Sequence, residues 1–428
     1  MKRNISPWSW IPTLYFAEGI PYVIAATSFA VIMYHNLGVS NAETAFYTSW
    51  LYLPWVIKPF WSPFVDAMKT KRWWILAMQL LIGAGLAGVA FCIPTTHFLQ
   101  STLCLLWLVA FSSATHDISA DGFYMLGLNE KEQSFFVGIR STFYRISMIA
   151  GQGALVWLAG HWEKSMGDVP RAWSCTLLVA AGLFICFFCY HFFILPHPDK
   201  DVPAREKNAI KTFFSSFKTF FQKKNIVLTL LFILLYRLGE SQLTKIASPF
   251  LMDGVENGGL AMSTQSVGIV YGTVGVLALT LGGILGGVLA AQGGLKKWLW
   301  PMVIAMNVPN LVYVYMAFMQ VSNFYVVSSL VAVEQFGYGF GFTAFMLYLI
   351  MVSKGEFSTS HYAICTGFMA LGMMLPGMAA GWIQEKIGYD WFFVWVCICT
   401  LPGIFLTPLI KKTLNQYEEE TIVRKEQE

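Results

Sequence analysis

The sequence predicts an all-α membrane protein with twelve transmembrane helices, and two observations carry this prediction. Of the 428 residues, 56% are hydrophobic and 12% are charged, whereas a soluble chain has about 25% charged residues. Apolar stretches of the roughly 20 residues that a helix needs to cross a bilayer occur twelve times. They cover residues 10–34, 44–65, 73–94, 99–127, 133–160, 172–195, 226–251, 264–291, 297–320, 323–352, 358–383 and 390–410.

The distribution of positive charge predicts that both ends of the chain are cytoplasmic. With that orientation, twenty Lys and Arg residues lie in the termini and the cytoplasmic loops. The outer loops hold only Lys164, Arg171 and Lys386. Loops rich in Lys and Arg stay on the cytoplasmic side, and this accounts for the net charge of +4 without a nucleic-acid partner. The first stretch is too long for a signal peptide and is predicted to be an uncleaved span.

A basic linker divides the chain into two sets of six spans. Residues 197–225 contain seven Lys and Arg residues and separate an N-terminal bundle, 1–196, from a C-terminal bundle, 226–412, which a charged tail, 413–428, follows. LYFAEGIPYVI in the first span and LYRLGESQLTK in the seventh share Leu-Tyr followed by Gly and Glu. This is the 6+6 pseudo-symmetric pattern of the major facilitator superfamily, in which the substrate site lies near the midplane between the halves.

Charged and amphipathic segments are expected at the cytoplasmic surface. IKTFFSSFKTFFQKK in the linker is predicted to lie on the membrane, in contact with lipids. Asp66, Lys71 and Arg72, between the second and third spans, resemble the superfamily's loop motif. We expect these three residues to form a latch at helix ends that holds the inner gate. Arg140 is nearer the cytoplasmic end of its span and is assigned to the gate or latch as well.

Acidic side chains inside the apolar stretches predict a polar cavity. Asp117 and Asp121, in WLVAFSSATHDISADGFYMLGL, lie four residues apart and therefore on one helix face. Because a carboxylate in hydrocarbon costs at least about 2.5–3.5 kcal/mol, that face must look into a wet space. Glu18 and Glu240 lie at similar depth, and the four acids are the candidates for proton coupling. Glu334 is either a buried structural acid or a ligand for a proton or a sugar hydroxyl.

Five cations also lie at membrane depth, and they predict how an anionic substrate is held. Lys58 either snorkels from a helix end or pairs with an acid or a substrate anion. Arg145 lies deeper than Arg140, and we expect its guanidinium to grip a substrate carboxylate or phosphate bidentately. Arg237 and Glu240 either neutralise each other or serve the site, and Lys245 lies farther out. Tyr15 and Tyr144 are candidates for stacking on a sugar ring.

Several separate blocks of the sequence resemble one family. WLYLPWVIKPFWSPFVDAMKTKRWW is similar to the second-span signature of the bacterial anhydromuropeptide permeases, the AmpG type, and of the related acetyl-CoA transporters. ATHDISADGFYML resembles the fourth-span pattern of these permeases, and LYRLGESQLTKIASPFL resembles the start of their second half. FSTSHYAICTGFMALG and AAGWIQEKIGYDWFF are similar to the last two spans, so the resemblance covers almost the whole chain.

The resemblance implies a function and assigns residues to it. Members of the family import N-acetylglucosaminyl-1,6-anhydro-N-acetylmuramyl peptides, or the disaccharide, across the bacterial inner membrane with the proton-motive force. We expect the chain to need no cofactor or metal and to be a monomer that contacts protons, its substrate and membrane lipids. Lys58, Asp117, Asp121 and Glu240 match the family's intramembrane charges.

Three departures from the family pattern leave the exact substrate open. Glu18 stands where a small residue is expected, His116 where Gln is frequent, and Glu240 where Asp is usual. A free N-acetylmuramate or a peptide-free sugar is therefore an alternative substrate, and acetyl-CoA or another anionic metabolite is a further one. No nucleophile elbow, H-E-x-x-H motif, P-loop or metal-spaced cluster occurs, which argues against an enzyme.

Overall fold

The structure, a computed structural model, describes residues 5–199, 201–203, 209–355 and 357–427, and within them every regular element is a helix. The all-α prediction is confirmed. Within these residues, eight helices are long and apolar enough to cross a membrane, or nine if the bent pair Pro7–Ala26 and Ser28–Asn36 is one crossing. Three of these eight, Ile226–Met252, Thr264–Gly293 and Leu295–Met319, consist of two or three shorter pieces. The last helix is interrupted at Gly388, where φ is 75°. The arrangement is compatible with twelve crossings.

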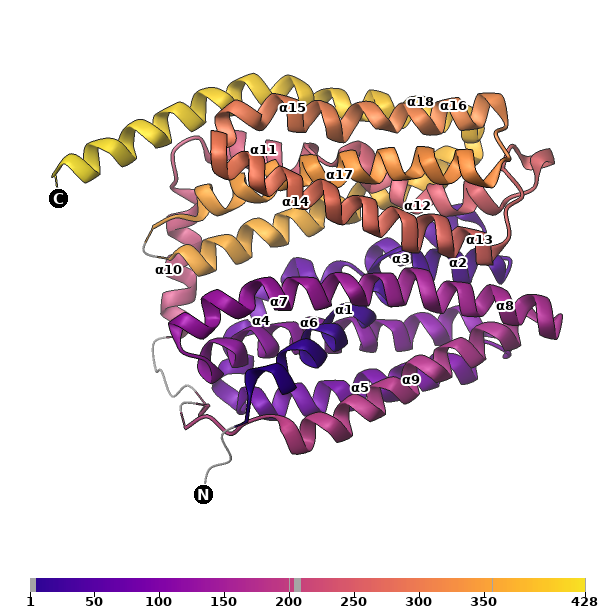
Figure 1. The fold of residues 1–428 in the computed structure, drawn as a ribbon, viewed down its shortest axis with the longest axis horizontal. Helices are drawn as coiled ribbons and strands as arrows, with labels where there is room; N and C mark the ends of the chain where they lie inside the picture. Colours follow the sequence, from indigo (N-terminus) through magenta and orange to yellow (C-terminus); the bar gives the residue numbers. More distant parts are fainter. Residues whose placement is uncertain (1–4, 200, 204–208, 356, 428) are drawn as a thin grey trace.

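Two bundles lie side by side, one above the other in Figure 1, and their helices run along the long axis of the molecule. We call residues 5–195 the N-half and residues 226–414 the C-half. The N-half contains α1 (Ile11–Ala26), α2 (Ser28–Asn36), α3 (Asn41–Trp50), α4 (Leu53–Met68), α5 (Lys71–Cys92), α6 (Phe98–Gly127), α7 (Glu130–Met148), the π-helix η2 (Ile149–Leu155), α8 (Val156–Met166) and α9 (Val169–Ile194).

The helix α10 (Ala209–Phe221) connects the two halves. In the C-half, the first crossing is divided into two helices by a short non-helical break at Tyr236 and Arg237. The C-half contains α11 (Ile226–Leu235), α12 (Leu238–Met252), α13 (Thr264–Val267), the π-helix η4 (Gly268–Gly275), α14 (Val276–Gly293), α15 (Leu295–Asn307), α16 (Leu311–Met319), α17 (Phe324–Ser353) and α18 (Ser358–Gln427).

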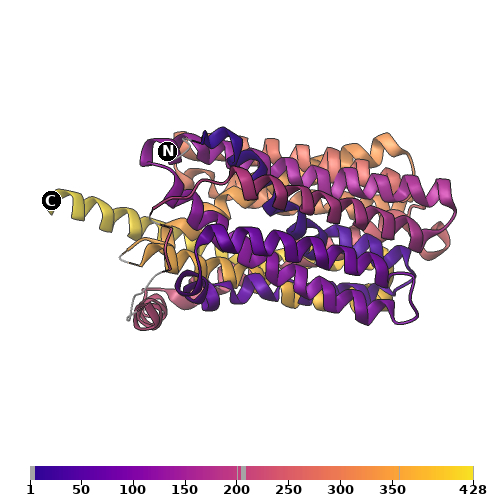
Figure 2. The same cartoon turned by 90° about the horizontal axis from the view of Figure 1, so that it is seen from below.

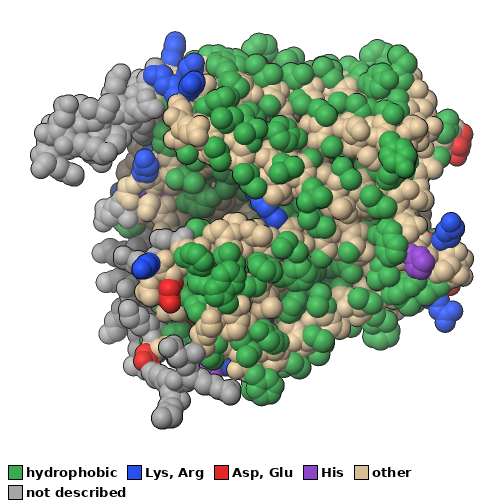
Figure 3. All heavy atoms as spheres, viewed as in Figure 1, with side chains coloured by type: hydrophobic (Ala, Val, Ile, Leu, Met, Phe, Trp, Pro, Cys, Tyr) green, Lys and Arg blue, Asp and Glu red, His purple; other side chains and the backbone are tan. Residues whose placement is uncertain are grey.

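The two ends of the bundle are distinct. Both termini and α10 lie at one end, here called the linker end, and the connections after α2, α8 and α12 lie at the far end (Figures 1 and 2). On the face drawn in Figure 3, hydrophobic side chains cover most of the lateral surface, and the charged side chains gather mainly at the two ends. This is the surface expected of a bundle that is surrounded by lipid, with polar groups at the two interfaces.

The halves meet at the far end along a first seam made by η2 and η4. A Cβ atom added to Gly272 would lie 2.2 Å from the carbonyl carbon of Gln152 and 2.3 Å from the nitrogen of Gly153. Nearby, a Cβ atom on Gly160 would lie 2.4 Å from the nitrogen of Gln265. Only glycine allows the two backbones to approach this closely, as at small-residue contacts between membrane helices.

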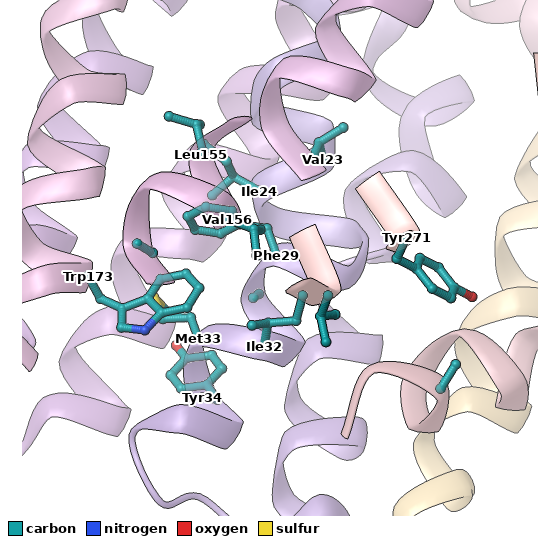
Figure 4. Close-up of a cluster of buried hydrophobic side chains, with 14 of the residues drawn as sticks. Val23, Ile24, Phe29, Ile32, Met33, Tyr34, Leu155, Val156, Trp173 and Tyr271 are labelled. Atoms are coloured by element: carbon teal, nitrogen blue, oxygen red, sulfur yellow. The ribbon is translucent and has the colours of Figure 1, made fainter. Parts of the chain in front are cut away.

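A second seam joins α3 to α18, again through a close backbone approach at a glycine. A Cβ atom on Gly381 would lie 1.9 Å from the carbonyl oxygen of Asn41. Polar contacts reinforce this seam, because Asn41 donates to the side-chain oxygens of Gln384 and Tyr389, each at 2.9 Å. Within the N-half, the helices behind the seams pack through a buried cluster that includes Phe29, whose ring meets Trp173 edge-on at 5.2 Å (Figure 4). The far end is therefore closed.

Asp253, just after α12, ties the far end together across the halves. His35 of α2 lies 3.1 Å from its carboxylate, and the Tyr389 hydroxyl donates to it. Burial by itself would raise the pKa of Asp253, but these hydrogen bonds, with a further one from Asn41, hold the pKa below its ordinary value. The charged form is thus the one that stabilises closure.

We expect Asp253→Asn to weaken this closure, by about 1–3 kcal/mol for a hydrogen-bonded charge, toward the lower end because the side chain is 22% exposed. Because the pKa of Asp253 is lowered, its contribution is complete near neutral pH and is lost as the pH falls below about 4. The measurement is the distance between spin labels on cysteines placed at the exposed Glu43 of α3 and Lys386 of α18, recorded from pH 7 to pH 3. A distance that is unchanged by both acid and the substitution would contradict this role.

The linker is attached to both halves. Asp201 accepts hydrogen bonds from the backbone nitrogens of Lys71, at 2.6 Å, and Arg72, at 3.0 Å, at the start of α5. Farther along, Phe217 of α10 contacts Phe60 of α4 in the N-half, with ring centroids 5.1 Å apart. The next aromatic residues of α10 contact α18 in the C-half, where Phe220 packs on His361 and Phe221 on Phe368.

Candidate functional site

A cavity of about 860 Å³ lies between the halves and reaches the linker end. Lys69 and Val202, both exposed, line its mouth, whereas Tyr52 and Met373 line its depth. Since both seams close the far end, the molecule is open on one side only. The volume falls in the range of about 300–1,000 Å³ typical of small-molecule sites.

The acidic face predicted for the fourth span does line this cavity. Asp117 and Asp121 lie on α6, which continues unbroken from Phe98 to Gly127 and so keeps the two residues one turn apart. Asp117 forms an ion pair with Lys58 of α4. Their side chains are 21% and 27% exposed, so the pair is in contact with the cavity. Lys58 therefore pairs with an acid, which is one of the two roles that the sequence left open.

Asp121 belongs to a second group of charges one turn nearer the linker end. The Arg140 guanidinium of α7 lies 3.0 Å from the Asp121 carboxylate. Tyr15 of α1 connects the two, because its hydroxyl donates to Asp121 at 3.2 Å and accepts from Arg140 at 3.1 Å. Arg140 also lies over the Tyr15 and Tyr124 rings, at 4.7 and 5.2 Å from their centroids. Such contacts add to the electrostatic hold on the guanidinium.

Glu18 completes the acidic cluster from α1. Its side chain lines the cavity beside Asp117 although the residue is only 8% exposed. One of its carboxyl oxygens, Oε2, is buried without a hydrogen-bond partner. The cluster therefore contains three carboxyl groups, of Glu18, Asp117 and Asp121, facing the two cations Lys58 and Arg140.

The C-half contributes a wall of different chemistry. Among the described residues that line the cavity, its one charged side chain is that of Arg237, and the remainder come from α18 and are neutral: Thr359, Tyr362, Ala363, Thr366, Met369, Ala370 and Met373. Aromatic residues of the N-half face this wall. Tyr22 packs edge-on against Trp55 at 5.1 Å, and Tyr144 also lines the cavity, as its assignment to the substrate requires.

Three other acids and cations from the sequence prediction lie elsewhere. Arg145 is not among the cavity residues, and its guanidinium contacts the Thr280 hydroxyl of α14 at 3.5 Å. Glu334 is 1% exposed inside the C-half and accepts a hydrogen bond from Gln335 at 3.0 Å. Glu240 is 4% exposed and also lies outside the cavity lining. Substrate or proton roles for these residues stay predictions.

Of the residues expected to form a latch, Arg72 holds a helix end within the N-half, and Arg140 instead pairs with Asp121 in the cavity. Arg72 donates to the carbonyl oxygens of Phe192 and Leu195, at 2.5 and 3.4 Å, and so caps the end of α9. Lys71 lines the cavity mouth. The side chain of Asp66 lies outside the described residues. Sequence reasoning missed the acid that holds the start of α5, Asp201, which occurs in the linker without a recognisable motif.

A comparison with family models decides the class of protein. Residues 13–354 match the model described as Major Facilitator Superfamily. The chain belongs to the Major Facilitator Superfamily. It is therefore a multi-pass membrane transporter of a small-molecule substrate, and it is not an enzyme. The two-bundle arrangement and the cavity between the bundles agree with this membership.

Curated relatives and solved structures add to this result. The resemblance to the AmpG type is confirmed: an anhydromuropeptide permease of Escherichia coli (strain K12) is 28% identical over 405 residues, 94% of this chain and 79% of that protein. A putative transporter AmpG 4 of Rickettsia conorii is 26% identical over 415 residues, 93% of this chain and 95% of that protein. The D-xylose-proton symporter superposes with a TM-score of 0.72 at 10% identity, covering 93% of this chain and 96% of that chain. The nucleoside transporter NupG gives 0.71 at 15%, covering 94% and 98%, and both likenesses concern the fold alone.

Proposed function

We propose that this protein is a proton-coupled importer of anhydromuropeptides, or of related N-acetylated amino-sugar fragments, in the bacterial inner membrane. The observation that carries the proposal is the cluster of three carboxyl groups and two cations at the depth of a cavity open on one side. The relationship to the anhydromuropeptide permease of E. coli supports the choice of substrate.

The orientation in the membrane follows from the charges. The linker end carries the termini, α10 and the Lys- and Arg-rich connections, and such segments stay in the cytoplasm. We therefore place the linker end in the cytoplasm. The conformation then has its cavity open to the cytoplasm and its periplasmic side closed, which is the state from which an importer releases its substrate.

Proton coupling is supported by the charge balance of the cluster. Lys58 and Arg140 neutralise Asp117 and Asp121, and within the described part of the chain Glu18 forms no ion pair of its own. An unpaired carboxylate in a buried position is costly unless it binds a proton. Glu18, beside Asp117, is therefore the position at which a transported proton is held when the cavity is empty.

The cavity also suits an amino-sugar ligand. Carboxylates accept hydrogen bonds from sugar hydroxyls, and the aromatic rings of Tyr22, Trp55 and Tyr144 offer faces for a sugar ring. The volume of about 860 Å³ exceeds what a single monosaccharide needs, which supports a disaccharide or a sugar with a short peptide.

Uptake into liposomes tests this function. Vesicles containing the protein are given labelled anhydromuropeptide, with and without an inward proton gradient, and with an uncoupler as a control. Accumulation that depends on the gradient is the expected result. Competition by unlabelled acetyl-CoA, rather than by wall fragments, would assign the carrier to anionic metabolites instead, and no uptake of any wall fragment would refute the proposal.

Asp121→Asn is expected to abolish uphill accumulation and to spare exchange of substrate between the two sides. The substitution keeps the volume and a hydrogen bond to Tyr15 but removes the charge that Arg140 balances. Uptake against a gradient and counterflow exchange are measured on the same vesicles. Asp390→Asn, which changes an acid outside the cavity lining, is the matched control. Full accumulation by Asp121→Asn would show that Asp121 takes no part in coupling.

A further inference from the structure

The charges of the cavity are divided unevenly between its two walls. The N-half wall carries the acidic cluster, in which each cation already lies against a carboxylate: Lys58 against Asp117, and Arg140 against Asp121. The C-half wall carries Arg237 and no carboxylate among the described lining residues. A ligand that spans the cavity therefore meets hydrogen-bond acceptors on one side and a positive charge on the other.

Arg237 has no ion pair within 4 Å in the part of the chain that the structure describes, although it is only 8% exposed. Its guanidinium donates to the Tyr338 hydroxyl and lies over the Tyr338 and Phe342 rings, at 5.3 and 4.9 Å from their centroids. Its Nε atom is buried without a hydrogen-bond partner. A buried charge with unsatisfied donors is costly in a membrane protein and marks a functional position.

The sequence places an acid nearby, but the fold keeps it from neutralising Arg237. Glu240 lies three residues on and is in electrostatic contact, yet it makes no ion pair with Arg237 and does not line the cavity. The reason is the break between α11 and α12. Arg237 is the residue before the first turn of α12, with φ −108° and ψ 19°, so its side chain does not follow the helical phase of Glu240.

The same break adds backbone groups that favour an anion. α12 begins at Leu238, directly after Arg237, and the first turn of a helix presents unpaired N–H groups and a partial positive charge. Broken helices of transporters use such ends to bind anionic substrate groups. The hydroxyl-bearing Tyr22 and Tyr52 of the opposite wall line the same cavity as Arg237.

The charge of the expected anion follows from these neighbours. The guanidinium fork matches a carboxylate bidentately. Because Glu240 lies close and reduces the local positive charge, the position suits one negative charge better than the two of a phosphate monoester. A carboxylate is therefore the chemistry that fits.

We propose that Arg237, at the start of α12, binds a carboxylate of the transported molecule and so fixes its orientation, with the sugar hydroxyls toward the acidic cluster of the N-half. The identity of the ligand rests on the proposed function, but the carboxylate subsite does not. In wall fragments this carboxylate belongs either to the lactyl group of the sugar or to the peptide.

The test compares acids with their amides. Binding to purified protein is measured for the anhydro-disaccharide with its free lactyl carboxylate, for its lactyl amide, and for the peptide-bearing form with free or amidated peptide carboxylates. The wild type is expected to prefer one acid over its amide by about 10- to 100-fold, the value of a charge-assisted hydrogen bond. A preference for the lactyl acid over its amide would assign the carboxylate to the sugar, and a preference for the peptide acid over its amide would assign it to the peptide.

Arg237→Gln is expected to lower the affinity for the acid and to leave the affinity for the amide unchanged, so that the ratio of the two affinities falls close to one. Arg237→Lys is expected to restore part of the preference for the acid. Lys386→Gln, which removes a cation outside the cavity lining, is the matched control and should keep the full preference. An acid-to-amide ratio that Arg237→Gln leaves at the wild-type value would overturn the proposal.

A second measurement needs no variant and covers the case in which Arg237→Gln does not fold. Phenylglyoxal modifies accessible arginines, and mass spectrometry of peptides gives the adduct at Arg237, with the exposed Arg171 as internal reference. Protection of Arg237 by an acid and not by its amide supports the subsite. If no wall fragment binds in any form, the proposed function fails, and an N-acetylated dipeptide with its amide is used instead. Absence of protection by every carboxylate would then overturn the subsite as well.

Discussion

Gly272→Ala is expected to abolish transport and to leave the far end open. The added methyl group would lie 2.2 Å from the backbone of Gln152, across the first seam. A flexible side chain can move away from such a clash, but here the neighbour is backbone, so the whole seam must separate. Because the two halves move as packed bodies, the second seam is expected to open with the first.

Two readouts follow this change. Uptake into vesicles is expected to fall to background, and the distance between spin labels on cysteines at Glu43 and Lys386 should increase, since α3 and α18 are held together only when the far end is closed. Gly287→Ala is the matched control: it lies on α14 in the same crossing, and a Cβ atom there has no neighbour within 4 Å. Wild-type uptake and an unchanged spin-label distance in Gly272→Ala would mean that the seam does not set the closed state.

Disrupting the ion pair of Lys58 and Asp117 is expected to lower both the stability of the protein and its transport activity. Lys58→Met or Asp117→Asn alone leaves one charge at membrane depth without its partner. Loss of one member of a fully buried pair costs about 3–5 kcal/mol, and cavity water reduces this, because the two side chains are 27% and 21% exposed. Each single variant should therefore unfold at a clearly lower temperature than the wild type.

The double variant separates the two roles of the pair. Lys58→Met with Asp117→Asn removes both charges, so we expect its unfolding temperature to recover most of the loss while uptake stays absent. A double-mutant cycle on the unfolding free energies isolates the interaction. Lys297→Met, which removes a cation at the linker end, controls for the loss of a lysine. Additive losses in the cycle would contradict a direct ion pair.

Much of the site was predictable because membrane insertion makes charge conspicuous in the sequence. The position of Asp117 and Asp121 on one face needs only an unbroken helix, and α6 is unbroken. Arg140 and Arg145 lie five residues apart, about 140° around a helix, so the sequence shows that they point apart. It does not show which of the two meets the acids, since that depends on how α7 is rotated against α1 and α6.

The positions at which helices are interrupted could not be predicted from the sequence. An intact helix would place Glu240 one turn from Arg237, where the two could pair. The break before α12 changes that geometry, and LLYRLGES contains neither a proline nor a paired glycine to announce it. The same holds for the π-helices η2 and η4, whose glycines resemble ordinary packing positions until the opposite half is in place.

The attachment of the linker sets a mechanical limit on the transport cycle. Asp201 fixes the beginning of the linker to α5 of the N-half, and more of α10 lies against α18 of the C-half than against α4. A fixed number of residues joins these two attachment points, and a polypeptide spans at most about 3.3–3.6 Å per residue. The length of this connection places an upper bound on how far the halves can separate at this end, and any insertion there lengthens the permitted stroke.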